Sequence, residues 1–194
     1  MFEQKKITYK MKLLSSLAKV FQDEEPVYQM ECQTLNALWG ETVSFQAAYT
    51  GDFFMRERLD VEVVSPLKDY IRVRTVEQVP VGRATNGIVD DNYLRTEAGL
   101  YPDLLRDVKD GKVIVCSNQW RSLWIDIEVT KDIAPRNYEI EVRLKKEGDV
   151  VASAKQRLTV IGVELPKQKI MHTEWMHADC LADYYHVDVF SEEH

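Results

Sequence analysis

The chain has 194 residues, of which 45% are hydrophobic and 29% are charged, a composition typical of a globular chain that buries a core. This length allows one domain plus a fragment and excludes two catalytic domains. The 32 acidic residues outnumber the 25 basic ones and give a net charge of -7, with no basic stripe for phosphate contacts, so nucleic acid is excluded as a partner.

The start of the chain is not expected to carry a targeting signal. Met1–Lys6 precedes mixed sequence rather than the apolar stretch of a signal peptide, and no apolar run reaches the roughly 18 residues of a membrane span. The three cysteines, Cys32, Cys116 and Cys180, are odd in number and far apart, which favours inert reduced thiols over a disulfide framework. We therefore expect a cytoplasmic protein with no membrane partner.

In chain order, the first candidate element is the segment 11–21, which fits either helical spacing or an edge strand. Further along, apolar and polar residues alternate with period two, which predicts strands with one buried and one exposed face. The alternation is weaker at 43–49, 59–63 and 71–73. Residues 28–35 are strand-like in length and composition.

A glycine-rich stretch, 82–112, separates the strands expected near 70–81 and 113–129. It looks too irregular for a strand and too long for a turn. Loops of this length in compact domains are often functional or mobile, and the alternative is an insertion that covers one end of a sheet.

The clearest strand signals lie at 123–129 and 137–145, where strict alternation predicts a buried face. The side chains predicted to be buried are Ile125, Ile127, Ile140, Val142 and Leu144. Glycine and charged residues at 146–149 predict an antiparallel hairpin into a strand at 150–163. About seven or eight strands result, with no long helix between them before residue 165. The predicted fold is mainly β, an antiparallel β-sandwich of immunoglobulin-like or similar type.

The composition changes after Leu165 and Pro166, because all four histidines fall in the last 23 residues. We expect a β-sandwich domain at 1–165 and the truncated start of a second unit at 166–194. The large apolar side chains of this tail, Tyr184 and Tyr185 among them, are expected to pack on the sandwich or on a second copy of the chain.

Three sets of residues suggest chemistry. His172, His177, Cys180 and His186 have ligand types that Zn²⁺ prefers, but their spacing matches no known zinc motif, so no metal or other cofactor is expected. The acidic runs 23–25 and 192–193 are expected to be solvated surface. Trp39, Trp120 and Trp124 suit either a sugar-stacking platform or core packing, and Trp124 lies on the polar side of its strand.

Several short stretches together carry a family resemblance. They are Leu38-Trp39-Gly40-Glu41 with the following Gln46, Tyr101-Pro102-Asp103-Leu104-Leu105, Asn118-Gln119-Trp120 with Leu123-Trp124-Ile125, Ala134-Pro135-Arg136-Asn137-Tyr138, and Thr173-Glu174-Trp175-Met176-His177-Ala178-Asp179-Cys180-Leu181-Ala182. With these motifs, residues 35–194 resemble the N-terminal part of bacterial proteins related to glycoside hydrolase family 123, including members whose barrel was long a domain of unknown function. Asn137 departs from a common glycine, and Leu104 from a common proline.

The resemblance implies a β-sandwich ahead of a (β/α)₈ barrel, whose catalytic acidic pair acts on N-acetylhexosaminides by substrate-assisted hydrolysis. By the same resemblance, 169–175 looks like the first barrel strand, and the acidic pair belongs to later strands. No catalytic residue is therefore assigned here. Trp175, His177 and Asp179 are the candidate substrate-binding residues; the alternative is that His177 and Asp179 cap the turn after the strand and hold Trp175 in place.

The leading hypothesis is a non-catalytic accessory domain of a glycoside-hydrolase-like protein. The chain alone is then not expected to be an enzyme, whereas its full-length parent is. The expected partners are carbohydrate in the full-length protein, the missing C-terminal barrel, and a second copy of the chain through the truncated tail. A carbohydrate-binding sandwich in its own right is the alternative, and an enzyme built on the His/Cys cluster is a third hypothesis.

Overall fold

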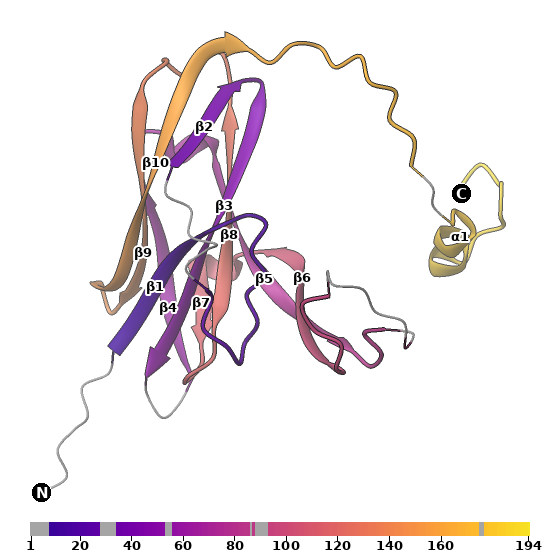
Figure 1. Ribbon diagram of the computed structural model, residues 1–194, viewed down its shortest axis with the longest axis horizontal. Helices are drawn as coiled ribbons and strands as arrows, with labels where there is room; N and C mark the ends of the chain where they lie inside the picture. Colours follow the sequence, from indigo (N-terminus) through magenta and orange to yellow (C-terminus); the bar gives the residue numbers. More distant parts are fainter. Residues whose placement is uncertain (1–7, 28–33, 53–55, 86, 88–92, 175–176) are drawn as a thin grey trace, which may run out of the picture.

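The computed structural model describes residues 8–27, 34–52, 56–85, 87, 93–174 and 177–194. Ten strands in these residues form two five-stranded sheets packed face to face, which confirms the predicted mainly β sandwich (Figure 1). The strands are β1 (Thr8–Ser15), β2 (Thr34–Trp39), β3 (Glu41–Asp52), β4 (Glu57–Val64), β5 (Ile71–Val81), β6 (Gly99–Asp107), β7 (Lys112–Val115), β8 (Arg121–Val129), β9 (Asn137–Lys146) and β10 (Asp149–Glu164).

The first sheet has the strand order β1-β3-β8-β5-β6, and the second has the order β2-β10-β9-β4-β7. Neighbouring strands are antiparallel except β2 and β10, which run parallel. Among the strands that the structure describes, this pair is the one exception to the predicted antiparallel pairing. Period-two alternation specifies which face of a strand is buried but not the direction of its partner, and no hairpin joins these two strands.

The core lies between the sheets, and the predicted buried set is confirmed. Ile125, Ile127, Ile140, Val142 and Leu144 are all 0% exposed. Their strands, β8 and β9, are the central strands of the two sheets, so each has a neighbour on both edges and a fully covered inner face. This position explains why their alternation is the strictest in the sequence.

The predicted hairpin between β9 and β10 is also confirmed. Lys146 pairs with Asp149 across a two-residue loop. Both loop residues have positive φ, 53° at Glu147 and 95° at Gly148. This is the pattern of a type I′ turn, whose twist matches that of the flanking strands.

The ambiguous segment 11–21 begins as a strand. Its first part belongs to β1, which pairs with β3 at the edge of the first sheet, and the chain turns after Ser15. Of the predicted strand at 28–35, residues 28–33 lie outside the described part of the chain, and Thr34 opens β2.

The stretch 82–112 contains more regular structure than predicted. Gly99–Asp107 forms β6, which pairs with β5, and Lys109–Gly111 forms a 3₁₀ turn ahead of β7. Because β6 is an edge strand and most of its side chains are exposed, it shows no apolar–polar alternation. Pro102 is tolerated in this strand because it lies at a sheet edge, where an N–H is not always needed.

After β10 the chain leaves the sandwich as an extended segment and ends beyond the short helix α1 (Asp179–Tyr185) (Figure 1). Residues 169–174 form no strand, so the first barrel strand implied by the resemblance stays a prediction, as does the boundary at 165/166. Tyr184 and Tyr185 are 76% and 67% exposed and do not pack on the sandwich. No helix in the described part of the chain is long and apolar enough to cross a membrane.

Candidate functional site

The residues predicted to bind substrate lie in the tail. Trp175 falls outside the described residues. His177 precedes α1 with its side chain 91% exposed, and its Nδ1 lies 3.9 Å from Oδ1 of Asp179, the first residue of the helix. Neither residue lines any of five well-formed cavities in the described part of the chain, and their roles as substrate contacts or caps stay predictions.

The His/Cys set is not gathered into a ligand sphere. Within the described ranges, no group of three or more His, Cys, Asp or Glu side chains is placed to hold a metal ion. Cys180 is an exposed free thiol, and Nδ1 of His172 lies 3.3 Å from a carboxylate oxygen of Glu174. The described residues therefore give no support to an enzyme built on this cluster.

The three tryptophans serve separate packing roles rather than one platform. Nε1 of Trp39 donates to the carbonyl of Ile133 at 2.8 Å, and Trp120 is buried against β1 and β3. Nε1 of Trp124 donates to Oδ1 of Asp126 at 2.6 Å on the outer face of the first sheet. Because each indole has its own neighbours, the packing interpretation fits all three.

The segment 16–22 crosses the outer face of the first sheet and forms one wall of a groove. Nε2 of Gln46 donates to the carbonyl of Ala18 at 2.7 Å, and Oε1 of Gln46 accepts from Oγ of Ser122 at 2.8 Å. Nε2 of Gln78 donates to the carbonyl of Val20 at 3.1 Å. The segment covers a small second core formed by Leu14, Ala18, Val20, Ala48 and Trp120. These contacts fix the position of the next residue, Phe21.

A concave surface of about 520 Å³, here called the aromatic groove, lies between this segment, β5 and β6. Its lining residues are Lys19, Phe21, Val79, Val81, Ala84, Tyr93, Leu94, Arg95, Tyr101, Pro102 and Asp103. The rings of Phe21 and Tyr101 meet edge to face with centroids 5.7 Å apart, and the Tyr101 hydroxyl donates to the carbonyl of Glu97 at 2.7 Å. Tyr93 is 46% exposed, so its ring remains accessible to a ligand.

Arg95 fixes one side of the aromatic groove. Its guanidinium lies 3.7 Å from the centre of the Phe21 ring and forms ion pairs with Asp23 at 2.7 Å and Glu24 at 3.1 Å. The hydrogen bond from Arg95 holds the pKa of Asp23 below its usual value, and the same bond raises the pKa of Arg95. The acidic run 23–25 is thus a structural ion-pair site, and the groove offers stacking rings beside fixed polar groups.

Sequence reasoning missed most of this groove. It used Tyr101 only as part of a family match and left Phe21 and Tyr93 unmentioned. The signal available in the sequence was the presence of aromatic residues next to and within the irregular stretch 82–112, together with the functional role that long loops often have.

A polar cluster on the outer face of the first sheet is internally satisfied. Asp126 accepts hydrogen bonds from Oγ of Ser44, Nε1 of Trp124 and the guanidinium of Arg74. Burial pushes the pKa of Asp126 upward, but the three donors together outweigh it and hold the pKa below its usual value. With both carboxylate oxygens occupied, Asp126 is not free to act as a base toward a ligand.

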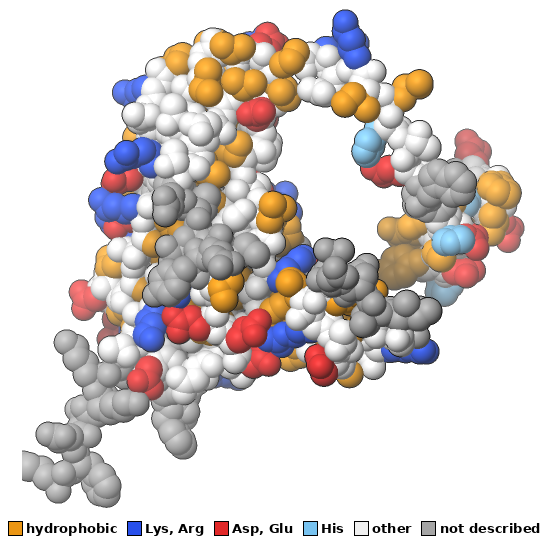
Figure 2. Space-filling view, viewed as in Figure 1, with side chains coloured by type: hydrophobic (Ala, Val, Ile, Leu, Met, Phe, Trp, Pro, Cys, Tyr) orange, Lys and Arg blue, Asp and Glu red, His pale blue; other side chains and the backbone are white. Residues whose placement is uncertain are grey.

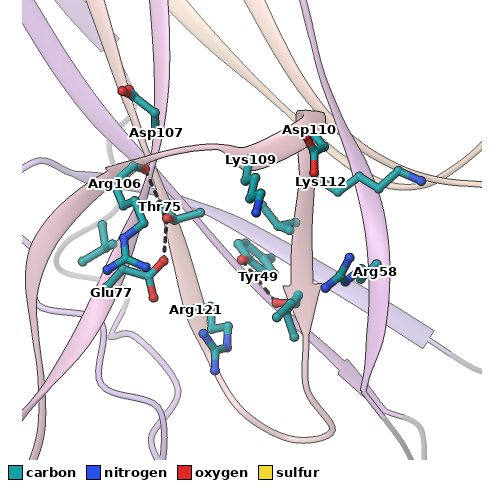
Figure 3. Close-up of a pocket in the computed structure, with 13 residues that line it drawn as sticks. Tyr49, Arg58, Thr75, Glu77, Arg106, Asp107, Lys109, Asp110, Lys112 and Arg121 are labelled. Atoms are coloured by element: carbon teal, nitrogen blue, oxygen red, sulfur yellow. Dashed lines mark hydrogen bonds between the residues drawn. The ribbon is translucent and has the colours of Figure 1, made fainter.

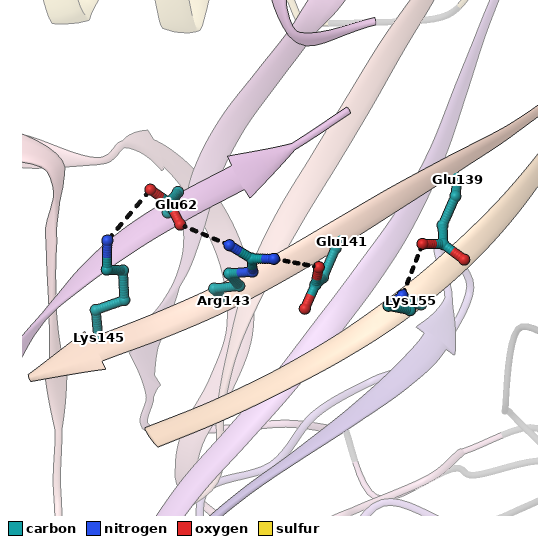
Figure 4. Close-up of polar contacts among 6 residues, drawn as sticks. All are labelled: Glu62, Glu139, Glu141, Arg143, Lys145 and Lys155. Atoms are coloured by element: carbon teal, nitrogen blue, oxygen red, sulfur yellow. Dashed lines mark hydrogen bonds and ion pairs between the residues drawn. The ribbon is translucent and has the colours of Figure 1, made fainter. Parts of the chain in front are cut away.

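The outer face of the second sheet carries a ladder of opposite charges (Figure 4). Glu62 bridges Arg143 and Lys145 at 3.3 Å each, and Arg143 also reaches Glu141 at 2.6 Å. Cross-strand pairs of this exposed kind contribute only about 0–1 kcal/mol each. Because the charges neutralise one another, this face is a solvated surface rather than a binding site.

Hydrophobic side chains gather at the end of the sandwich where β10 passes into the tail (Figure 2). Ile161 and Val163 are 42% and 56% exposed there. A Cβ on the intervening Gly162 would come within 2.7 Å of Pro135 and 3.5 Å of Trp39, so the backbone is packed closely at this point. This apolar end, defined by Ile161 and Val163, is unlike the charged outer face of the second sheet.

Comparison with known proteins supports the fold. A scan against models of protein families found no match, and a search of curated proteins found no significant match. Among solved structures, a family 123 glycoside hydrolase from Clostridium perfringens, described in terms of glycolipid glycan hydrolysis, superposes with a TM-score of 0.67 at 17% identity. The likeness covers 94% of this chain and 32% of that one, so this chain spans about a third of that enzyme's length.

Two further solved structures are weaker matches. The N-terminal domain of PorA has a TM-score of 0.36 at 10% identity, covering 79% of this chain and 98% of that one. The seventh ScaB type I cohesin from Pseudobacteroides cellulosolvens has a TM-score of 0.31 at 9% identity, covering 85% and 99%. Both scores are too low to carry an argument. At 17% identity the stronger likeness shows a shared fold. The family resemblance expected from the sequence is therefore supported for the fold alone.

Proposed function

We propose that this chain is a non-catalytic N-terminal accessory domain of a glycoside-hydrolase-like protein that acts on carbohydrate, with N-acetylhexosaminides as the substrate class. The observation that carries the proposal is the match of the sandwich, over 94% of the chain, to about a third of a family 123 glycoside hydrolase. In this proposal, residues 166–194 are the truncated start of a barrel that carries the catalytic acids.

The apolar end supports a contact with a following domain. Ile161 and Val163 lie where the chain leaves the sandwich, so a domain attached through the tail would be held beside them. Exposed apolar patches often mark contacts between domains, because a domain that is surrounded by solvent exposes few contiguous apolar side chains. The proposal assigns this end to the barrel and leaves the charge ladder facing solvent.

Hydrolysis assays and the reading frame beyond His194 test the accessory role. Purified chain should release no chromophore from aryl N-acetylhexosaminides, because glycoside hydrolysis needs carboxyl groups that flank the scissile bond. The reading frame should continue for the length of a barrel and include an Asp–Glu pair. Turnover that disappears in Asp179→Asn, or a reading frame without a barrel, would refute the accessory role.

The apolar end can be tested separately in the full-length protein. Val163→Glu should weaken the domain contact and speed protease cleavage in the segment 165–174. Val150→Glu is the matched control, because Val150 is 49% exposed and lies at the opposite end of the same strand. Equal cleavage rates in the two variants would mean that the barrel does not use this end.

The tail residues keep the role that the resemblance implies. In the full-length protein, Trp175, His177 and Asp179 would follow the first barrel strand and contact the sugar, since barrel active sites lie at the C-terminal ends of the strands. The tail also offers a surface for a second copy of the chain, because Tyr184 and Tyr185 are exposed. A cytoplasmic location is supported by the free thiols of Cys116 and Cys180, which fit a reducing compartment.

A carbohydrate-binding role for the sandwich itself is the second candidate, and the aromatic groove favours it. Tyr93 and Tyr101 offer ring faces, while Lys19 and Asp103 supply polar groups for hydroxyls. Titration with N-acetylglucosamine should shift NMR signals around the groove, and Tyr93→Ala should abolish the shifts. Tyr184→Ala, which removes an exposed ring outside the groove, should leave them unchanged. Shifts that survive Tyr93→Ala would reject this role.

A further inference from the structure

A second cavity, of about 280 Å³, lies between the edges of the two sheets, where the 3₁₀ turn Lys109–Gly111 connects β6 to β7 (Figure 3). Strands of both sheets contribute to its walls, with Tyr49 from β3 and Arg121 from β8 on one side and Arg58 from β4 on the other. Its position is distinct from that of the aromatic groove, and no residue lines both.

Positive charge dominates this cavity, although the protein as a whole has a net charge of -7. Five cationic and three acidic side chains line it. One cation and one carboxylate of this set form ion pairs with residues outside the cavity. Lys112 lies 3.4 Å from Asp60, and Asp107 lies 2.8 Å from Arg72. Two carboxylates, those of Glu77 and Asp110, then remain to balance four cations.

The four remaining cations are Arg58, Arg106, Lys109 and Arg121, and none of them forms a side-chain ion pair or hydrogen bond within the described part of the chain. Glu77 accepts a hydrogen bond from Oγ1 of Thr75 at 2.7 Å and keeps its negative charge, so Glu77 and Asp110 together offset two of the four cations. The cavity therefore keeps an excess of positive charge. Because the site is concave and partly enclosed, the electrostatic potential of this charge is stronger there than on an open surface.

Among the cavity's cations, Arg121 carries a buried donor from which no described protein group accepts a hydrogen bond. Its Nε is buried and has no hydrogen-bond partner in the described structure. The Nε atoms of Arg74 and Arg143 are also unpartnered, but the terminal nitrogens of those side chains hold Asp126 and Glu141. Arg121 has no such carboxylate. An unsatisfied buried donor of a charged group is costly and is normally met by water, an ion or a ligand.

Tyr49 forms the floor of the cavity and adds a neutral donor. Its side chain is 2% exposed, and its hydroxyl is 3.4 Å from the carbonyl of Ile114, a long and weak contact. Burial raises the pKa of Tyr49 well above its usual value, so the phenol keeps its proton. Figure 3 shows Lys109 and Arg58 reaching toward Tyr49 from two sides, with Arg121 below it.

We propose that this cavity binds an oxyanion, the sulfate, phosphate or carboxylate group of a small molecule, through Arg58, Lys109 and Arg121. Guanidinium groups match the planar or tetrahedral array of oxygens in such anions and form charge-assisted hydrogen bonds with them. The volume of about 280 Å³ accommodates the anion together with part of the molecule that carries it. This proposal does not rest on the accessory role.

The test is an NMR titration of the purified chain that follows the arginine Nε–H signals. The probes are inorganic sulfate, inorganic phosphate, glucuronate and sulfated N-acetylglucosamine, and the controls are unmodified N-acetylglucosamine and sodium chloride at matched ionic strength. The Arg121 Nε–H signal should shift with at least one anionic probe and with neither control. Tighter binding of the sugar acids than of the inorganic ions would identify an anionic sugar as the ligand, and the reverse order would identify a free anion.

Two variants establish the site. Arg121→Gln should weaken binding about tenfold or more, because a hydrogen bond between charged groups is typically worth that much. Lys109→Gln, which changes an exposed residue in a turn and spares the core, should also weaken it. Arg157→Gln removes the same charge from an exposed position on β10 and should change the affinity less than about twofold. Absence of any Arg121 shift, or equal losses in all three variants, would overturn the proposal.

Discussion

Two buried glutamines offer a matched test of how the segment 16–22 is held. Gln46 is 2% exposed and Gln156 is 1% exposed, so both amides are removed from water. Gln46 makes short hydrogen bonds at both ends of its amide, to the carbonyl of Ala18 at 2.7 Å and from Ser122 at 2.8 Å. Gln156 makes one, to the carbonyl of Arg157 at 2.9 Å, and its Oε1 is buried without a partner.

Replacing each glutamine by leucine should therefore have very different costs. Gln46→Leu leaves the buried carbonyl of Ala18 without its short hydrogen bond, whereas the Ser122 hydroxyl keeps a second acceptor, the carbonyl of Leu123 at 3.2 Å. One unsatisfied buried group costs about 1–3 kcal/mol and the lost Ser122 hydrogen bond about 1 kcal/mol more, so we expect a loss of about 2–4 kcal/mol. Gln156→Leu removes one hydrogen bond but also an unsatisfied oxygen, so the free energy of unfolding should change by less than about 1 kcal/mol.

Urea denaturation of the purified chain, followed by tryptophan fluorescence, measures both free energies of unfolding. Hydrogen exchange adds a local measurement, because Gln46→Leu should speed exchange of the amides in 16–22 more than those of β8. Equal destabilisation by the two substitutions would refute this reasoning. It would mean that the loss of amide volume and shape, rather than the satisfied hydrogen bonds, sets the cost.

Three further predictions concern other parts of the chain. Gly162→Ala should destabilise the chain by about 1–3 kcal/mol in urea denaturation, because the new Cβ would lie 2.7 Å from Cγ of Pro135, whereas Gly82→Ala, with nothing within 4 Å, should not. The pKa of Asp126 is lowered in the folded state, so the stability that its ionised form contributes is complete above the ordinary pKa of 3.8 and is lost as the pH falls below it. Asp126→Asn should therefore make the free energy of unfolding less dependent on pH below about 4. An unchanged pH dependence in that range would contradict this reasoning. Amides in 170–190 should exchange with solvent well before those of β8 and β9, and equal protection would require the boundary near residue 166 to be abandoned.

The parts of the fold that the sequence predicts best are those whose burial is one-sided and complete. Ile125 and Ile140 stand on the central strands β8 and β9, so their alternation with polar residues reflects a fully covered inner face. β6 escaped prediction because an edge strand with mostly exposed side chains has no such pattern. The parallel pairing of β2 with β10 depends on which strands meet across a long stretch of chain, which local patterns do not encode.

The candidate sites were harder to predict because they are assembled from distant segments. The aromatic groove needs Phe21 beside Tyr101, and the cationic cavity needs Arg58 beside Arg121. No spacing motif links such positions, since the register of the strands brings them together. The tail presents a different difficulty, because the roles of His177 and Asp179 were inferred from the family resemblance and not from a pattern in this chain.

The strand order also determines when this domain is able to fold during synthesis. The central strands β8 and β9 begin only at Arg121 and Asn137, so β3 and β5, which flank β8, are made long before the strand that joins them. The pairing of β2 with β10 has to wait until about residue 164 has been made. Contacts so distant in sequence slow folding, and unpaired strand edges expose a chain to aggregation in the meantime. A ribosome-bound chain stopped before β8 should therefore bind chaperones and be cut by protease, and should become resistant only after β10 emerges.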